Sequence, residues 1–288
     1  MKFSNPRFTF APKLDFTVKS TISISLIIFT LLAFGNVAAQ AEDDTAKKLL
    51  ALIDYIGGDY KNAVEADKVR NPNEYQEQLE FARRSLELFD QVKKADSDKA
   101  SIESDLKVLV KHVEDKADPK TVTAIAHGIE KKIIDAYGIV PYPRQLPSLA
   151  AGRQLFMENC AQCHGPTGKG DGPGRESMNP KQPLPANFTD AEFMAGLSPF
   201  KAFNAISFGV DNTAMASFAA LSEAQRWELA FYVLSLRFPA DAAKTGEALM
   251  RKNPVPPELM GIATVSSLTN EELAEKLKEH FRDRKSVV

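Results

Sequence analysis

Residues 152–172 read GRQLFMENCAQCHGPTGKGDG and contain both cysteines of the chain. Cys160 and Cys163 are separated by two residues, and His164 follows directly. The glycines that come next allow the backbone to turn tightly beside this motif. The segment therefore predicts a site in which two thiols and one imidazole lie together.

Three kinds of chemistry can use this motif. A disulfide or redox-active pair is compatible with an oxidising compartment, but the small loop between the two cysteines would stabilise little by chain entropy. A zinc site needs four ligands, and no other cysteine is available. Covalent haem attachment uses every residue, because two thiols bond the porphyrin and the adjacent imidazole reaches the iron. We therefore predict one covalent haem c on Cys160 and Cys163, with His164 as an axial ligand; the disulfide or redox pair is the alternative.

A haem bound in this way calls for a second axial ligand, commonly a methionine. Met215 follows a loop and precedes an apolar helix, so we predict that it is this ligand. Met178 and Met194 are its rivals. The alternative for Met215 is that it fills a gap in the core.

Two helices are expected to close the haem region. One contains Gly152, Leu155 and Phe156, and the other runs from about Glu223 to Arg237 and carries Trp227. The small Gly152 is expected at their crossing. The glycine-rich loop lacks the Lys-Ser or Lys-Thr pair of a phosphate-binding loop.

The first 41 residues have the order of a secretory signal peptide, with basic, apolar and small segments in turn. The apolar core from Ile22 to Phe34 is short for a membrane span. We therefore expect export to the periplasm. The alternative is an uncleaved leader that tethers the protein to the membrane.

Residues 42–138 show helical periodicity and predict a bundle of four helices. We expect the first helix to end at Gly57-Gly58 and Asn73 to cap the second. Prolines in residues 139–149 predict an extended linker. Residues 150–238 form the haem domain, and residues 239–288 a helical C-terminal tail whose last helix opens with a capping box from Thr269 to Glu272.

Composition limits the function. The chain has 288 residues, of which 44% are apolar and 26% charged, and its net charge is −2. A folded chain without a basic excess lacks the electrostatic attraction that nucleic-acid binders use. We therefore exclude nucleic acid as the partner.

Two parts of the chain resemble known families. The segments GRQLFMENCAQCHGPTGKGDG, PANFTD and TAMASFAALSEAQRWELAFYVLSL resemble a class I cytochrome c domain. The preceding stretch LIDYIGGDYKNAVEADKVRNPNEYQEQLEFA is similar to the helical region of the bacterial cytochrome c/iron permease fusion family. The resemblance implies that Cys160 and Cys163 hold the haem and that His164 and Met215 are its axial ligands.

The sequence also departs from that family. Ala216 follows Met215 where the family usually has proline. The family continues into a multi-span permease with Arg-Glu-x-x-Glu motifs, and these 288 residues contain neither feature. A permease role is therefore not carried over, and a membrane iron permease is expected as a separate partner.

The resemblance to an iron-uptake family directs attention to oxygen donors in the helical region. Carboxylates and phenolates are hard ligands that favour ferric over ferrous iron. Glu77 and Glu80 lie three residues apart on one helix face and form the predicted ferrous iron site. The alternative is a solvated surface paired with Arg83 and Arg84. The other candidate donors are Asp54, Tyr55, Asp59, Tyr60, Glu74 and Tyr75.

The sequence thus predicts an all-α protein, with an N-terminal helical bundle followed by a class I cytochrome c domain. We expect an electron carrier rather than a stand-alone enzyme, one that accepts electrons from ferrous iron, works with a redox partner protein and serves a separate permease. The alternatives are a general periplasmic shuttle to a terminal oxidase or reductase, a haem enzyme with an open iron site, and a binding protein that presents iron to a partner.

Overall fold

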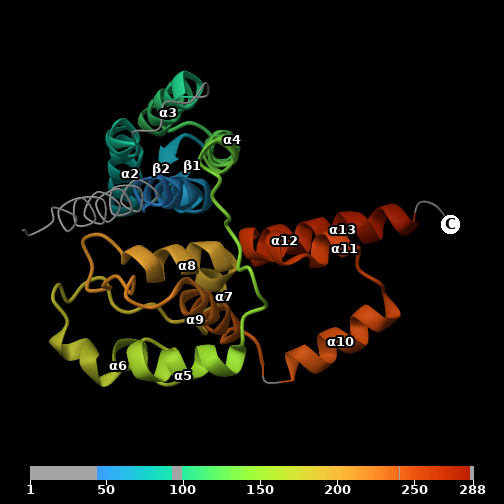
Figure 1. Ribbon diagram of the computed structural model, residues 1–288. Helices are drawn as coiled ribbons and strands as arrows, with labels where there is room; N and C mark the ends of the chain where they lie inside the picture. Colours follow the sequence, from blue (N-terminus) through green and yellow to red (C-terminus); the bar gives the residue numbers. More distant parts are fainter. Residues whose placement is uncertain (1–43, 93–98, 240, 286–288) are drawn as a thin grey trace, which may run out of the picture. The chain divides into compact units, whose positions relative to one another are not determined.

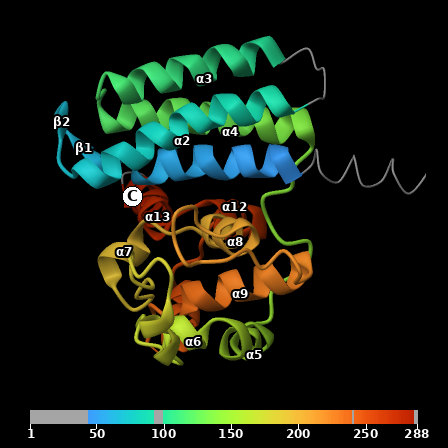
Figure 2. The same ribbon diagram turned by 90° about the vertical axis from the view of Figure 1, so that its left-hand side faces the viewer.

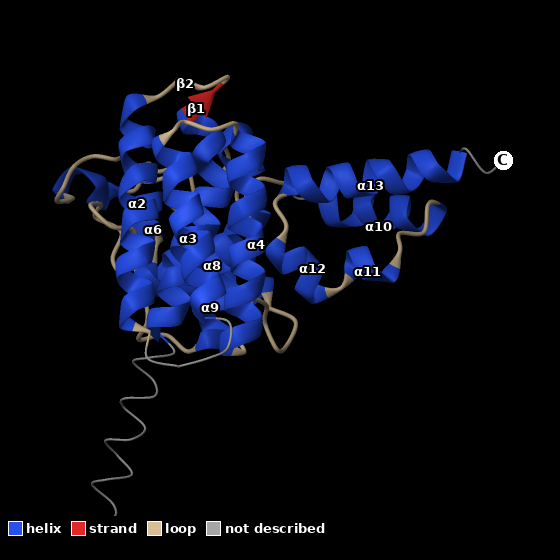
Figure 3. Ribbon diagram, turned by 90° about the horizontal axis from the view of Figure 1, so that it is seen from above, coloured by secondary structure: helices blue, strands red, loops and turns tan. Residues whose placement is uncertain are grey.

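The computed structural model describes residues 44–92, 99–239 and 241–285. By its internal contacts the chain divides into Met1–Glu42 and Asp43–Val288, and every described residue belongs to the second unit. The predicted leader lies outside the described residues. Figure 3 shows that the described residues form helices and one small hairpin. The predicted all-α class is confirmed.

Four helices form the N-terminal bundle and run alongside one another (Figure 2). Apolar residues at the predicted helical spacing form their inward faces, and in the third helix Ile102, Leu106, Leu109 and Val113 are all buried. Burial of such a stripe is the main source of stability for an amphipathic helix. The bundle consists of a first helix over residues 44–63, followed by α2 (Pro72–Gln91), α3 (Lys99–Glu114) and α4 (Pro119–Tyr137).

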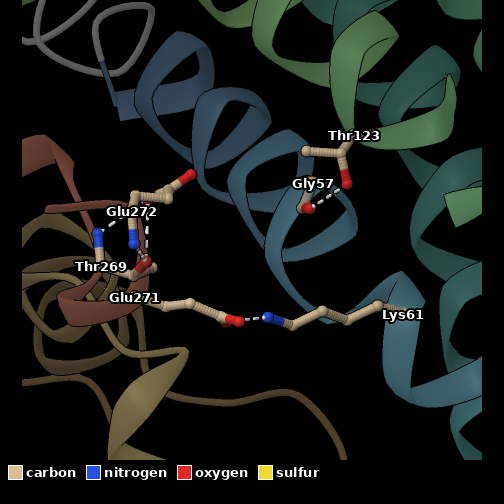
Figure 4. Close-up of polar contacts among 6 residues, drawn as sticks. All are labelled: Gly57, Lys61, Thr123, Thr269, Glu271 and Glu272. Atoms are coloured by element: carbon tan, nitrogen blue, oxygen red, sulfur yellow. Dashed lines mark hydrogen bonds and ion pairs between the residues drawn. The ribbon is translucent and has the colours of Figure 1, made fainter. Parts of the chain in front are cut away.

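The first helix does not end at Gly57-Gly58, so that prediction is wrong. It continues through both glycines to residue 63. A Cβ added at Gly57 would lie 3.2 Å from the Cβ of Ala126 in α4, and the Thr123 hydroxyl donates to the Gly57 carbonyl at 2.7 Å (Figure 4). The glycine therefore serves close helix packing, a use that local sequence does not distinguish from a stop signal.

The cap of α2 lies two residues earlier than predicted. The side chain of Asn71, not Asn73, accepts hydrogen bonds from the backbone amides of Asn73 and Glu74. Pro72 then occupies the first turn, where its missing N–H leaves no hydrogen bond unmade. The prediction for Asn73 is corrected accordingly.

A short antiparallel hairpin joins the first helix to α2 and was not predicted. Its strands are β1 (Val64–Glu65) and β2 (Lys68–Val69), with Val64 opposite Val69. The turn places Ala66 at φ 49° and Asp67 at φ 61°. Turns with two positive φ values usually contain Asn-Gly or Asp-Gly, so Ala-Asp gives no recognisable signal.

The C-terminal half of the chain packs around two crossing helices, α5 (Leu149–Asn159) and α9 (Glu223–Ser235). A Cβ added at Gly152 would lie 2.2 Å from the carbonyl oxygen of Glu228, so only glycine permits this approach. The predicted crossing at Gly152 is confirmed. Trp227 is fully buried and stacks on Phe203 with ring centroids 4.1 Å apart. This half also includes α6 (Ala161–His164), the 3-10 helix η1 (Pro173–Ser177), α7 (Ala191–Ala195) and α8 (Pro199–Phe208).

Helix α8 lies between the first helix of the bundle and α9 in both Figure 1 and Figure 2. Residues between Gly138 and Ser148 form no helix or strand and connect the two halves. The predicted domain boundaries stay a prediction, although α4 ends at Tyr137 and α5 begins at Leu149.

The tail contains four helices, of which the last opens with the predicted capping box. Thr269 and Glu272 exchange side-chain-to-backbone hydrogen bonds of 2.8 and 3.2 Å. Among the described helices of the chain, none has the length and apolar character needed to cross a membrane. The tail helices are α10 (Ala242–Lys252), α11 (Pro257–Met260), α12 (Ile262–Ser267) and α13 (Asn270–Lys285).

Candidate haem site

The two cysteines and the histidine lie on a short helical turn at the end of α5. The backbone carbonyl of Cys160 accepts hydrogen bonds from the amides of Cys163 at 3.1 Å and His164 at 2.9 Å. Cys160 is thus both the residue after α5 and the residue before α6. This turn presents the three side chains to one cavity.

The glycine-rich loop folds back against this turn. The amide of Gly172 donates to the Cys163 carbonyl at 3.1 Å. A Cβ at Gly172 would lie 2.4 Å from the Gln162 carbonyl oxygen, so the loop can approach the motif only through a glycine. The glycine-rich loop therefore packs against the backbone of the Cys160–His164 motif and is hydrogen-bonded to it.

The His164 ring is held in one orientation by two contacts. Its Nδ1 lies 3.1 Å from the Ala186 carbonyl oxygen, and its ring stacks on Phe188 with centroids 4.6 Å apart. When Nδ1 carries the proton and donates to that carbonyl, Nε2 keeps its lone pair. Burial lowers the pKa of His164, partly offset by the hydrogen bond to Ala186, and so favours the neutral imidazole that can bind a metal.

The environment of Cys160 bears on the redox alternative. Burial raises the pKa of the Cys160 thiol to about 12, and the neighbouring Cys163 adds to the increase. Reactive cysteine pairs need the opposite shift, because the thiolate is the nucleophile. The site therefore does not favour a redox-active pair.

One large cavity, of about 1630 Å³, brings the predicted haem residues together. Cys160, Cys163, His164 and Met215 all line it. Met178 also lines the cavity, whereas Met194 is fully buried and absent from its wall. The apolar part of the wall includes Phe156, Leu197, Ile206, Val210, Phe218 and Val233.

The loop that carries Met215 is fixed by its backbone. The amide of Met215 donates to the Thr213 hydroxyl at 3.0 Å, and its carbonyl accepts from the Val210 amide at 3.0 Å. After Ala216, the Ser217 hydroxyl donates to the Ser207 carbonyl at 2.6 Å. These bonds hold the loop in the absence of the usual proline.

The residues present fit a c-type haem. Two thiols, an oriented imidazole and a thioether line a mainly apolar cavity, which is the donor set that such a haem requires. The assignment of Cys160, Cys163, His164 and Met215 to the haem rests on this arrangement and remains a prediction at the level of single residues.

The same cavity is also lined by residues of the bundle and of the first turn of α8. Tyr55, Asp59 and Glu74 line it, together with Lys201. The Lys201 ammonium forms an ion pair with Asp59 and lies 4.7 Å from the Tyr55 ring centroid. The Lys201 side chain is only 8% exposed.

Lys201 was not singled out in the sequence, although a signal exists. It is the only charged residue in the apolar α8 sequence PFKAFNAISF. A buried charge requires a partner of opposite sign. That rule predicts a partner for Lys201 but cannot identify Asp59.

The two glutamates of the predicted iron site lie outside this cavity wall. Glu77 is half-buried and Glu80 is exposed. Burial raises the pKa of Glu77, as do Glu74, Asp59 and Glu80, while Lys201 acts in the opposite direction. Among the described residues, no three or more His, Cys, Asp or Glu side chains are arranged to hold a metal ion. The Glu77 and Glu80 site stays a prediction.

Comparison with known families identifies both halves of the chain. Residues 38–140 match the iron permease-associated 4-helix bundle domain, and residues 149–237 match cytochrome c. Residues 149–237 are thus a cytochrome c domain within a longer chain. In particular, the chain joins an iron permease-associated bundle to a cytochrome c domain, as predicted, and this domain implies covalent c-type haem and transfer of electrons to or from a redox partner.

Two relatives show similarity over part of the chain. A thiosulfate dehydrogenase from Stutzerimonas stutzeri (strain A1501) is 31% identical over 106 residues, which are 37% of this chain and 33% of that protein. The chain thus matches about a third of that relative's length. The Kuenenia stuttgartiensis reducing HAO-like protein complex has 28% identity and a TM-score of 0.32, covering 42% of this chain and 61% of the solved one.

Proposed function

We propose that this protein is an exported monohaem cytochrome c that takes single electrons from ferrous iron in iron uptake. One observation supports the proposal most: the cavity that contains the haem motif is also lined by carboxylates of the iron permease-associated bundle. The leader-like first 41 residues support a periplasmic location. The ferric product would pass to a separate membrane permease.

The residues of the cytochrome c domain that line the cavity would bind the haem. Cys160 and Cys163 would hold the haem, and the Ala186 carbonyl and Phe188 orient His164 toward it. A haem held here supplies a one-electron acceptor. Met215 would supply a thioether ligand to the iron of that haem in addition to the His164 imidazole. This arrangement favours a carrier over a stand-alone enzyme.

The bundle would supply the oxygen donors for the iron ion. Asp59 and Glu74 face the cavity, and Glu77 lies on the same helix as Glu74. Carboxylates stabilise ferric iron more than ferrous iron and thereby favour loss of one electron. Each ferrous ion would become ferric and deliver one electron, with no bond broken in the protein.

Anaerobic mixing of the oxidised holoprotein with ferrous iron tests this proposal. We expect the haem spectrum to change to the reduced form at a rate that saturates with iron concentration. Glu74→Gln and the double variant Glu77→Gln/Glu80→Gln should slow that reduction several-fold. Glu87→Gln, an exposed change on the same helix, is the matched control.

If neither variant differs from the Glu87→Gln control, the iron role is rejected, while electron transfer by the cytochrome c domain stands. Thiosulfate as the electron donor in the same assay tests a second candidate, suggested by the thiosulfate dehydrogenase relative. Rapid reduction by thiosulfate but not by ferrous iron would favour that candidate.

A further inference from the structure

The first turn of α13 connects the tail to both halves of the molecule. Lys61 in the first helix of the bundle and Glu271 in α13 form an ion pair of 2.7 Å (Figure 4). The Arg237 guanidinium, which follows α9, donates to the Asn270 side chain. Asn270 and Glu271 also line the cavity that contains the haem motif. This turn therefore forms one edge of the cavity.

A group of three carboxyl groups lies where α13 meets the bundle. Asp54 comes from the first helix, Glu130 from α4 and Glu272 from α13; we call these three residues the carboxyl trio. The Oδ2 atom of Asp54 and the Oε1 atom of Glu130 are buried and have no hydrogen-bond partner among the described residues. Buried oxygen atoms without donors strongly disfavour the ionised form.

The charges around the carboxyl trio do not neutralise it. Lys201 from α8 is the cation that acts on Asp54, and its ammonium is already paired with Asp59. Asp59 and Glu272 act on Asp54 as further negative charges, and Asp54 and Glu272 act on Glu130. Lys61 is paired with Glu271.

The pKa values of Asp54 and Glu130 follow from this environment. Burial raises the pKa of Asp54 to about 7, with Lys201 opposing the increase and Asp59 and Glu272 adding to it. Burial also raises the pKa of Glu130, and the charges of Asp54 and Glu272 add to the effect. Both groups therefore retain protons at a pH where exposed carboxyl groups are ionised.

We propose that the carboxyl trio is a proton-dependent latch that holds the first turn of α13 over the cavity edge. Protonated carboxyl groups allow α13 to dock against the bundle. Ionisation of Asp54 and Glu130 places negative charges on the first helix and on α4 that repel Glu272 of α13, and so drives α13 away. This latch is independent of whether iron is the electron donor.

The direction of the pH dependence follows from proton linkage. A carboxyl group whose pKa is raised in the docked state binds more protons there than in the undocked state. Docking is then strongest below the ordinary carboxyl pKa and weakens as the pH rises toward about 7. Each unit of pKa difference that docking itself produces corresponds to about a tenfold change in the docking equilibrium.

Hydrogen exchange on the full-length holoprotein tests the latch. Protection factors, corrected for the intrinsic exchange rates, are compared for α13, α2 and α9 between about pH 5 and pH 8. We expect protection in α13 to fall about tenfold or more over this range, while α2 and α9 change little.

Three variants make the test specific. Glu130→Gln removes one ionisable group and should retain α13 protection at the higher pH; Asp54→Asn should do the same and serves as the second variant if Glu130→Gln does not fold. Glu279→Gln, an exposed change within α13, is the matched control and should behave as the unchanged protein. Protection that does not depend on pH, or depends on pH equally in Glu130→Gln and the control, would overturn the proposal. So would a loss shared by α2 and α9, because it would report unfolding of the whole molecule.

Discussion

The Lys201 ammonium of α8 is paired with the Asp59 carboxylate of the first bundle helix, 142 positions away in the chain. The Asp59 side chain is 25% exposed, whereas Lys201 is almost completely buried. The pair joins the two halves at the cavity wall. Its loss should therefore weaken both the packing of α8 and the shape of the cavity.

Lys201→Met should destabilise the protein by about 3 kcal/mol, because it leaves the Asp59 carboxylate without its buried partner. It also removes the contact of the ammonium with the Tyr55 ring. Chemical denaturation followed by circular dichroism measures the free energy of unfolding. Lys107→Met, which breaks an exposed pair with Glu103, should change it by less than about 1 kcal/mol. Equal effects of the two variants would contradict the structural role of Lys201.

Met215→Ala should abolish the sulfur-to-iron charge-transfer band of the oxidised protein, because the thioether is its source. Met178→Ala should leave that band intact although Met178 lines the same cavity. Near-infrared and visible absorption of both holoproteins checks the expectation. The reverse result would assign the axial position to Met178.

Gly152→Ala should destabilise the cytochrome c domain by about 2 kcal/mol or more, because the added methyl group meets the Glu228 carbonyl in a closely packed crossing. Gly246→Ala in α10 is the control, since no atom lies within 4 Å of its added Cβ. That change should be neutral or stabilise α10 by about 0.5–1 kcal/mol. Thermal unfolding of both variants distinguishes a packing effect from a general effect of replacing glycine.

Asn71→Ala should lower the stability of the bundle by about 1 kcal/mol, because two backbone amides at the start of α2 lose their acceptor. Asn73→Ala should have a smaller effect, since the Asn71 side chain accepts the hydrogen bonds of the cap. The two free energies of unfolding, measured side by side, test the corrected position of the cap. A larger effect at Asn73 would restore the first assignment.

Local patterns predicted the parts of this molecule that depend on neighbouring residues. Three features are of this kind: the helical spacing of apolar residues in α3 and α4, the capping box of α13, and the motif from Cys160 to His164. Tertiary contacts decided the rest. Gly57 continues its helix because α4 approaches it, and the Asp59 and Lys201 pair joins segments that no local pattern relates. Ala66 and Asp67 form a turn with positive φ values, and these two residue types do not predict such a backbone conformation.

The cavity shared by both halves also affects how such a protein can be divided. A fragment cut at the proline-rich connector would retain its thiols and imidazole but would lose one flank of their enclosure, and Lys201 would be left facing water without its counter-ion. In the isolated C-terminal fragment, the haem site would consequently be more exposed to water than in the whole chain. Replacing the bundle with an unrelated domain would also change the solvation of the haem site, unless the new domain placed a carboxylate next to Lys201.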